Sequence, residues 1–301
     1  MSGHRMTLAD LDSRQRRIVA DKRLSERMPP TDWLRLLAPL ARFELATSRL
    51  RKQTRDAGLF SVAALFVTFI ILAMSGFQLW LVPLPVTCLV LGVVASRRYQ
   101  RLKSLALAGK LPRVVVPLLA MLVEDGADGA PAQLELDLRP ADVPEKLVRD
   151  ENLPPAGRYD RIWLRVYQDP WMRGQAELRD GTRIEWRVVD EVRHLQRRQS
   201  YGKRKTKSKL RNRSTLTVTL ALPKGHRVAA ATPATDAATA ASTSTGTDVR
   251  VTPGDKRDRI EVSRVIKAAS IESPEAAHLL DVIAVAFARA RGAVAARAVG
   301  A

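Results

Sequence analysis

The chain has 301 residues, with 50 Lys and Arg against 31 Asp and Glu, so its formal net charge at pH 7 is +19. This charge favours anionic lipid, nucleic acid or an acidic protein as a partner, and it does not select a fold. The single cysteine, Cys88, excludes an intramolecular disulfide and a cysteine-based zinc site.

The first 56 residues divide near Pro29 and Pro30. Residues 1–30 are rich in charge, and we expect a mobile or partly helical arm. From Thr31 onward, apolar residues recur at helical spacing with basic residues opposite them, which predicts an amphipathic helix over 31–56 that is kinked or interrupted at Pro39. Such a helix suits the membrane surface and the face of a cytosolic domain equally well.

The following segment, 57–96, contains no Asp, Glu, Lys, Arg or His over forty residues. Because one membrane-spanning helix needs about 20 apolar residues, this length predicts a transmembrane hairpin with helices over 59–75 and 79–95. Its turn is expected near 76–78, which lies before Pro83 and Pro85. The alternatives are a re-entrant loop and a buried hairpin of a soluble protein.

Basic residues flank this segment on both sides, and the connector between its halves is uncharged. Short loops rich in Lys and Arg stay on the cytoplasmic side of a membrane. The sequence therefore predicts a multi-pass protein of the cell (inner) membrane with both termini in the cytoplasm. The flanking residues are Arg42, Arg49, Arg51, Lys52 and Arg55 before the segment, and Arg97, Arg98, Arg101, Lys103 and Lys110 after it.

Residues 97–130 are expected to form a helical neck, broken at Gly109 and restarted at Pro112. From 131 to 301 the apolar period changes from 3.6 to 2, which predicts a cytosolic β-rich domain of about six or seven antiparallel strands. Asp180-Gly181 predicts a two-residue hairpin turn, and Asp169-Pro170 predicts a second turn. A loop without strands is expected to end at Pro155.

The end of the domain combines a low-complexity loop and a helix. Residues 228–247 are mostly Ala, Thr and Ser, and we expect a disordered loop. A terminal helix is predicted over 274–291. The fold class is therefore membrane-anchored α+β. The strand and helix count is similar to that of the pleckstrin-homology-like fold, and this similarity implies a barrel or sandwich.

No catalytic or metal-binding motif is found in the sequence. The histidines, His4, His194, His226 and His278, are far apart and have no Cys, Asp or Glu at metal-ligand spacing. No phosphate-binding loop and no G-x-S-x-G motif occur. We therefore expect no metal or cofactor, although an enzyme whose site residues are distant in sequence remains an alternative.

The densest charge lies between 197 and 213, where nine residues are basic and none is acidic. We expect these residues at the tip of a long hairpin that binds anionic lipid headgroups or an acidic protein partner. The basic residues are Arg197, Arg198, Lys203, Arg204, Lys205, Lys207, Lys209, Arg211 and Arg213.

This basic hairpin has two other interpretations. It can be a solvated tip that protects a sheet edge, or it can tether nucleic acid through phosphate contacts. Tyr201 is the only aromatic residue in the segment, which argues against stacking of bases. The sequence thus favours a non-enzymatic inner-membrane protein that presents a basic cytosolic domain.

Overall fold

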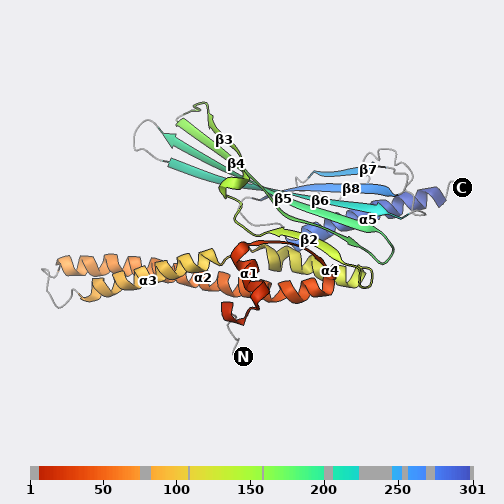
Figure 1. Cartoon of the computed structure of the whole chain (residues 1–301). Helices are drawn as coiled ribbons and strands as arrows, with labels where there is room; N and C mark the ends of the chain where they lie inside the picture. Colours follow the sequence, from red (N-terminus) through yellow and green to blue (C-terminus); the bar gives the residue numbers. More distant parts are fainter. Residues whose placement is uncertain are drawn as a thin grey trace. The chain divides into compact units, whose positions relative to one another are not determined.

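The computed structural model describes residues 7–74, 83–107, 109–157, 159–199, 206–223, 246–252, 257–268 and 275–298. In these residues the fold is α+β, with five α-helices and one antiparallel sheet of eight strands (Figure 1). The chain divides into two compact units. One is Met1–Asp21 with Ala38–Pro112, and the other is Lys22–Leu37 with Arg113–Ala301.

The first unit begins with a short 3-10 helix, η1 (Leu8–Asp10), and helix α1 (Ser13–Asp21). The start of α1 is capped reciprocally, because the Gln15 backbone N donates to Asp12 Oδ1 at 2.6 Å and the Asp12 backbone N donates to Gln15 Oε1 at 3.1 Å. Ile18 and Val19 are buried. The predicted arm over 1–30 is therefore helical in part, from Ser13 to Asp21, and its mobility stays a prediction.

Helix α2 (Pro30–Met74) runs without interruption through Pro39, so the predicted 31–56 helix and the first predicted span are one element. A proline inside a helix removes one hydrogen bond and costs about 3 kcal/mol. Burial of Leu36, Leu37 and Leu40 around Pro39 offsets this cost. The expected interruption at Pro39 is wrong because the sequence pattern does not show this burial, and the alternative of a kink stays a prediction.

Helix α3 (Pro83–Ser104) packs antiparallel to α2 at small residues. A Cβ placed on Gly58 would lie 3.8 Å from Ala95 Cβ, and one on Gly92 would lie 3.9 Å from Ser61 Cβ. Among the described helices only α2 is long and apolar enough to cross a membrane, so the second span of the predicted hairpin is not established. The predicted turn at 76–78 lies outside the described residues.

The predicted neck is helical in part. Gly109 has φ +73° and follows the end of α3, as expected for a helix break. The chain then forms a π turn, η3 (Leu111–Val115), and helix α4 (Val116–Asp125).

The second unit is built on the sheet, whose strand order is β1-β2-β4-β5-β6-β8-β7, with β3 paired to β4. This path stays open in the part of the chain that is described, so the barrel or sandwich of a pleckstrin-homology-like fold is not seen. The strands are β1 (Arg23–Met28), β2 (Ala132–Asp137), β3 (Leu147–Leu153), β4 (Tyr159–Glu177), β5 (Arg183–Gln199), β6 (Thr206–Leu222), β7 (Thr247–Thr252) and β8 (Asp258–Ala268).

Several strands differ from the sequence-based expectation. Neither β1 nor β3 was expected, because both are short, charged and pair at sheet edges. Strand β4 continues through Asp169-Pro170, where a turn was predicted. A β-bulge between Asp169 and Met172 leaves the exposed Pro170 out of the ladder, so the strand is bent there and does not reverse.

A hairpin turn at Asp180-Gly181 is confirmed, but its loop has three residues, 179–181, where the Asp-Gly pair predicted two. The Leu178 backbone N donates to the Thr182 carbonyl at 2.9 Å, and Gly181 has φ +76°.

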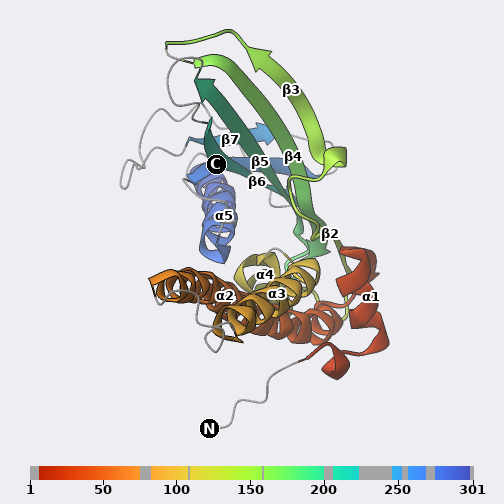
Figure 2. The same cartoon turned by 90° about the vertical axis from the view of Figure 1, so that its left-hand side faces the viewer.

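Helix α5 (Ala276–Ala298) lies along one face of the sheet and contacts β6 and β8 (Figure 2). It extends beyond the predicted 274–291 helix. Its buried Leu279 and Ile283 share this core with Val218 and Val262 of the sheet. Trp33 donates its Nε1–H to the Ala132 carbonyl at 3.0 Å, which joins the start of α2 to β2. The predicted disordered loop lies outside the described residues as far as 245.

Candidate anion-binding surface

Four strand segments extend beyond their neighbours and form what we call the distal sheet: 147–153, 159–168, 191–199 and 206–213 (Figure 1). Strand β8 ends at Ala268, which pairs with Asn212, and β2 pairs with β4 only as far as Met172. The distal sheet is therefore built from β3 and from the ends of β4, β5 and β6.

Directly opposite residues of an antiparallel pair project from the same face. The register pairs Arg197 with Lys207, Leu195 with Lys209, Arg193 with Arg211 and Glu191 with Arg213. Five of the nine predicted site residues thus share one face, which we call the basic face: Arg197, Lys207, Lys209, Arg211 and Arg213. Arg198 pairs with Thr206 on the opposite face, and Lys203, Arg204 and Lys205 lie outside the described residues.

The cations of the basic face lack acidic partners. Lys207, Lys209, Arg211 and Arg213 are exposed, and none makes an ion pair with another described residue. The nearby carboxylate of Glu191 is already 2.6 Å from Arg193 Nε. The surface therefore keeps an uncompensated positive charge that attracts anions.

Arg197 is held differently, because its guanidinium carbon lies 5.6 Å from the centre of the Tyr159 ring. This is a cation–π contact, which orients the charge without neutralising it.

Two further cations lie on the basic face and were not predicted, and one of them, Arg193, is ion-paired with Glu191. Arg193 pairs with Arg211, and exposed Lys267 of β8 pairs with Arg213. Arg193 and Arg197 are an even number of residues apart. A continuous strand through both would therefore have predicted that Arg193 lies on the same face as Arg197. Lys267 had no such signal, because the register between β6 and β8 cannot be derived from the sequence.

Half-buried apolar side chains lie next to the cations on the same face. Leu195 of β5 is the register partner of Leu164 of β4, and Arg193 of β5 is the register partner of Val166 of β4. All three apolar side chains are partly exposed. The face is therefore an apolar strip on β4 bordered by cations on β5 and β6.

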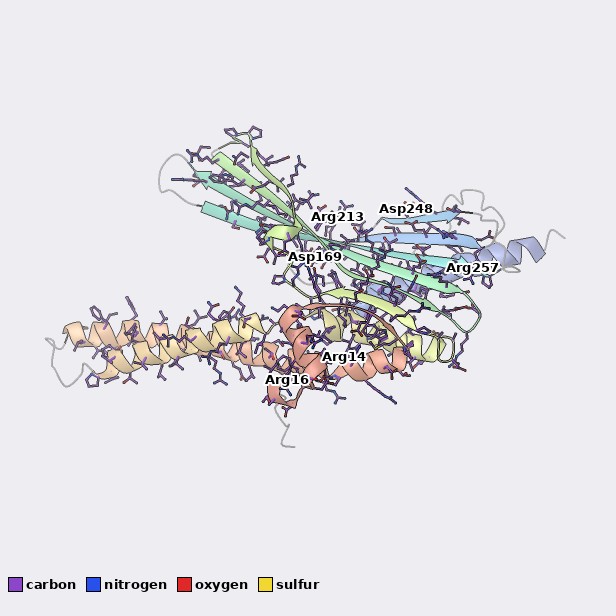
Figure 3. The ribbon with its side chains drawn as sticks, viewed as in Figure 1. Arg14, Arg16, Asp169, Arg213, Asp248 and Arg257 are labelled. Carbon is purple, nitrogen blue, oxygen red and sulfur yellow. The ribbon has the colours of Figure 1, made fainter. Side chains whose placement is uncertain are left out.

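A buried polar cluster lies where the distal sheet begins. Lys146 Nζ is 2.7 Å from Asp169 Oδ1 and 3.3 Å from Asp137 Oδ2. Asp169 is opposite Asp190 in the register, and Ser214 Oγ donates to Asp190 Oδ1 at 2.7 Å. Figure 3 labels Asp169 and Arg213, which both lie near this junction. The cluster fixes the short helix η4 (Pro144–Lys146), which leads into β3, to the bulge of β4.

The carboxyl group of Asp137 belongs to the same network. Burial by itself raises the pKa of Asp137. Hydrogen bonds from Arg139 and the nearby charge of Lys146 outweigh this effect and lower the pKa to about 2. Arg139 NH2 lies 2.9 Å from Asp137 Oδ2. Asp137 is thus ionised at neutral pH and stabilises the two cations beside it.

The buried carboxylates are explained by these contacts. Asp169 and Asp190 are almost completely buried, and among the described residues no group of His, Cys, Asp and Glu is arranged to hold a metal ion. These buried carboxylates therefore have a structural role at the base of the distal sheet. The charged groups of the basic face, in contrast, are exposed to solvent.

A scan against protein-family models, a search of curated proteins and a search of solved structures each return no match for this chain. Function is therefore argued from the geometry of the chain itself.

Proposed function

We propose that the chain is a non-enzymatic inner-membrane protein whose cytosolic β-rich unit binds anionic lipid headgroups through the basic face. The observation that carries the proposal is the alignment of Lys207, Lys209 and Arg211 with Arg213 on one exposed face without acidic partners. A polybasic segment near an anionic membrane gains about 1 kcal/mol per Lys or Arg.

The membrane anchor of the proposal is α2 with α3, which cross the bilayer twice. Their apolar side chains are exposed to an extent that is unusual for a soluble protein; Phe60 is 77% exposed and Phe66 is 68% exposed in α2, and Leu89 is 55% exposed in α3. Insertion into lipid would cover these side chains, at about 1.5–3 kcal/mol each.

The pairing of β1 with β2 in the second unit supports an even number of membrane crossings. Strand β1 precedes the apolar helices and β2 follows them, yet the two strands pair over six residues, from Arg23 with Asp137 to Met28 with Ala132. A single crossing would place these strands on opposite sides of the membrane. The basic flanks then favour the cytoplasm for both ends.

The topology is tested by crosslinking β1 to β2 in intact cells. Ser25 and Glu135 are register partners, and Cα atoms of such partners are about 4.5–5.5 Å apart, within the range of a disulfide. With Cys88 replaced by Ser, the S25C/E135C pair should crosslink under mild oxidation. The S25C/T217C pair, from separate strands, should not. Absence of the first crosslink, or release of the protein by alkaline carbonate, would refute the two-span anchor.

Lipid binding is tested with the full chain in nanodiscs of neutral lipid, offered anionic or neutral vesicles. We expect K207Q/K209Q/R211Q to abolish capture of anionic vesicles at low salt. The matched control is R161Q/R165Q/R198Q, which removes the same charge from the opposite face of the same distal sheet, where Arg161 and Arg198 are register partners. Equal loss in both variants would show that net charge, and not the basic face, determines binding. Capture that is unchanged in the first variant would refute the lipid proposal.

A further inference from the structure

Two adjoining hollows lie on the same face of the sheet as the basic face, further along β5 and β6. The first has a volume of about 420 Å³ and the second about 630 Å³, and Glu135, Arg173 and Arg187 line both. Residues Arg187 and Arg193 have the same parity along β5, which has no bulge against β6. The hollows are therefore on the face of the sheet opposite to α5.

Two arginines stand directly opposite each other at the boundary between these hollows. Arg173 of β4 is the register partner of Arg187 of β5, both are exposed, and neither makes an ion pair in the described part of the chain. Like charges directly opposite each other destabilise a sheet. Their Cβ atoms are about 5 Å apart, so the two guanidinium groups can together hold one phosphate or carboxylate.

The opposite side of the first hollow carries the carboxylate of Glu261, whose register partner on β7 is Arg250, itself 3.5 Å from Asp248. Glu261 of β8 is the partner of Thr219, and Thr217 is the partner of Arg187. The short threonine side chains of β6 make a floor between β5 and β8, which are about 10 Å apart. Glu261 is exposed and has no ion pair within the described residues.

The other two glutamates that line this hollow are engaged. Glu185 Oε1 is 3.5 Å from Arg183 Nε, and Glu135 Oε1 accepts a hydrogen bond from Gln133 Nε2 at 3.2 Å. Glu135 is also the register partner of Arg173, so one side of the hollow carries two arginines beside one carboxylate, and the other side carries Glu261.

The backbone beneath the arginine pair is rigidly packed. A Cβ on Gly174 would lie 2.3 Å from Trp186 Cζ2 and 2.7 Å from the Gln133 carbonyl oxygen, so the indole ring occupies the space of a side chain. Trp186 is 2% exposed. The residues next to Arg173 and Arg187 are thus fixed against each other, which holds the pair in place before a ligand arrives.

We propose that this hollow binds a small zwitterion, with a phosphate or carboxylate held by Arg173 and Arg187 and an ammonium group held by Glu261. Two sources carry this chemistry: the phosphoethanolamine headgroup of a lipid, and a free solute such as O-phosphoethanolamine. The site is separate from the basic face and does not depend on the function proposed for it.

The test is calorimetric titration of the full chain in nanodiscs of phosphatidylcholine with O-phosphoethanolamine, inorganic phosphate or ethanolamine. We expect O-phosphoethanolamine to bind at least tenfold more tightly than either fragment. R173Q/R187Q should remove binding of phosphate and of O-phosphoethanolamine. E261Q should keep phosphate binding and lose the preference for O-phosphoethanolamine. R161Q, an exposed arginine on the opposite face of the distal sheet, is the control and should change neither.

The outcomes separate the proposal from its competitors. No preference for O-phosphoethanolamine over phosphate, or unchanged binding by R173Q/R187Q, would overturn the zwitterion site. Weaker apparent binding of the soluble probe when phosphatidylethanolamine is added to the nanodisc would identify a lipid headgroup as the source, and unchanged binding would identify a free solute. R173Q/R187Q should still capture anionic vesicles, so failure here is distinct from failure of the basic face.

Discussion

Replacement of Lys146 by Met is expected to destabilise the β-rich unit strongly, because it removes the ammonium group that lies 2.7 Å from a buried carboxylate. The Lys146 side chain is 6% exposed and the Asp169 side chain is 0% exposed, with 2.7 Å between Nζ and Oδ1. Removing one partner of a buried ion pair costs about 3–5 kcal/mol. The Arg165–Asp150 pair, at 3.2 Å and about half exposed on both sides, provides the comparison, and removing such a pair costs under about 1 kcal/mol.

The assay is guanidinium unfolding of the full chain in detergent micelles, followed by tryptophan fluorescence. K146M should lower the free energy of unfolding by at least about 3 kcal/mol, and R165M by less than about 1 kcal/mol. K146M/D169N should recover part of the loss, because no uncompensated charge then stays buried. Equal and small losses in K146M and R165M would refute the role of the cluster as a clamp at the base of the distal sheet.

Three further predictions concern the same unit. G174A should cost about 1–3 kcal/mol of unfolding free energy, since its Cβ would lie 2.3 Å from the Trp186 ring, and W186F should restore part of it in a double-mutant cycle. G181A should cost about 1–2 kcal/mol, because φ is +76° in the hairpin turn, and thermal unfolding measures it. The lowered pKa of Asp137, about 2, means that its stabilisation is complete above about pH 4 and is lost as pH falls toward 2, so D137N should flatten the acid-unfolding profile in that window.

The parts of the fold that the sequence predicts are those with local signals. Asp180-Gly181 specifies a turn through the positive φ of glycine, and the alternation around Ile184 and Trp186 specifies a strand with one buried face. Strand β1 carries no such alternation. It forms because β2, more than a hundred residues later, offers a partner. Long-range pairing of this kind leaves no trace in a single sequence.

The candidate surface shows the same division. The density of basic residues between 197 and 213 is visible in the sequence, but the face on which each lies depends on register, and a shift of one residue would exchange the two faces. The partner strand adds Lys267, and the buried network around Asp169 lies where the sequence predicted a turn. The position of the basic residues along the chain is therefore predictable from local composition. Their arrangement on one face depends on the pairing of strands.

The arrangement of the sheet gives its two faces different roles. Helix α5 covers one face over β6 and β8, and buried residues such as Val218 and Val262 fill that side. The other face carries the hollow at Arg187 and, further along β5, the cations around Arg197. An apolar cover on one side fixes the register, and the register in turn fixes which charges stand together on the open side. A change that slips β5 against β6 by one residue would therefore disrupt both proposed binding surfaces at once, whereas a single surface substitution would disrupt only one.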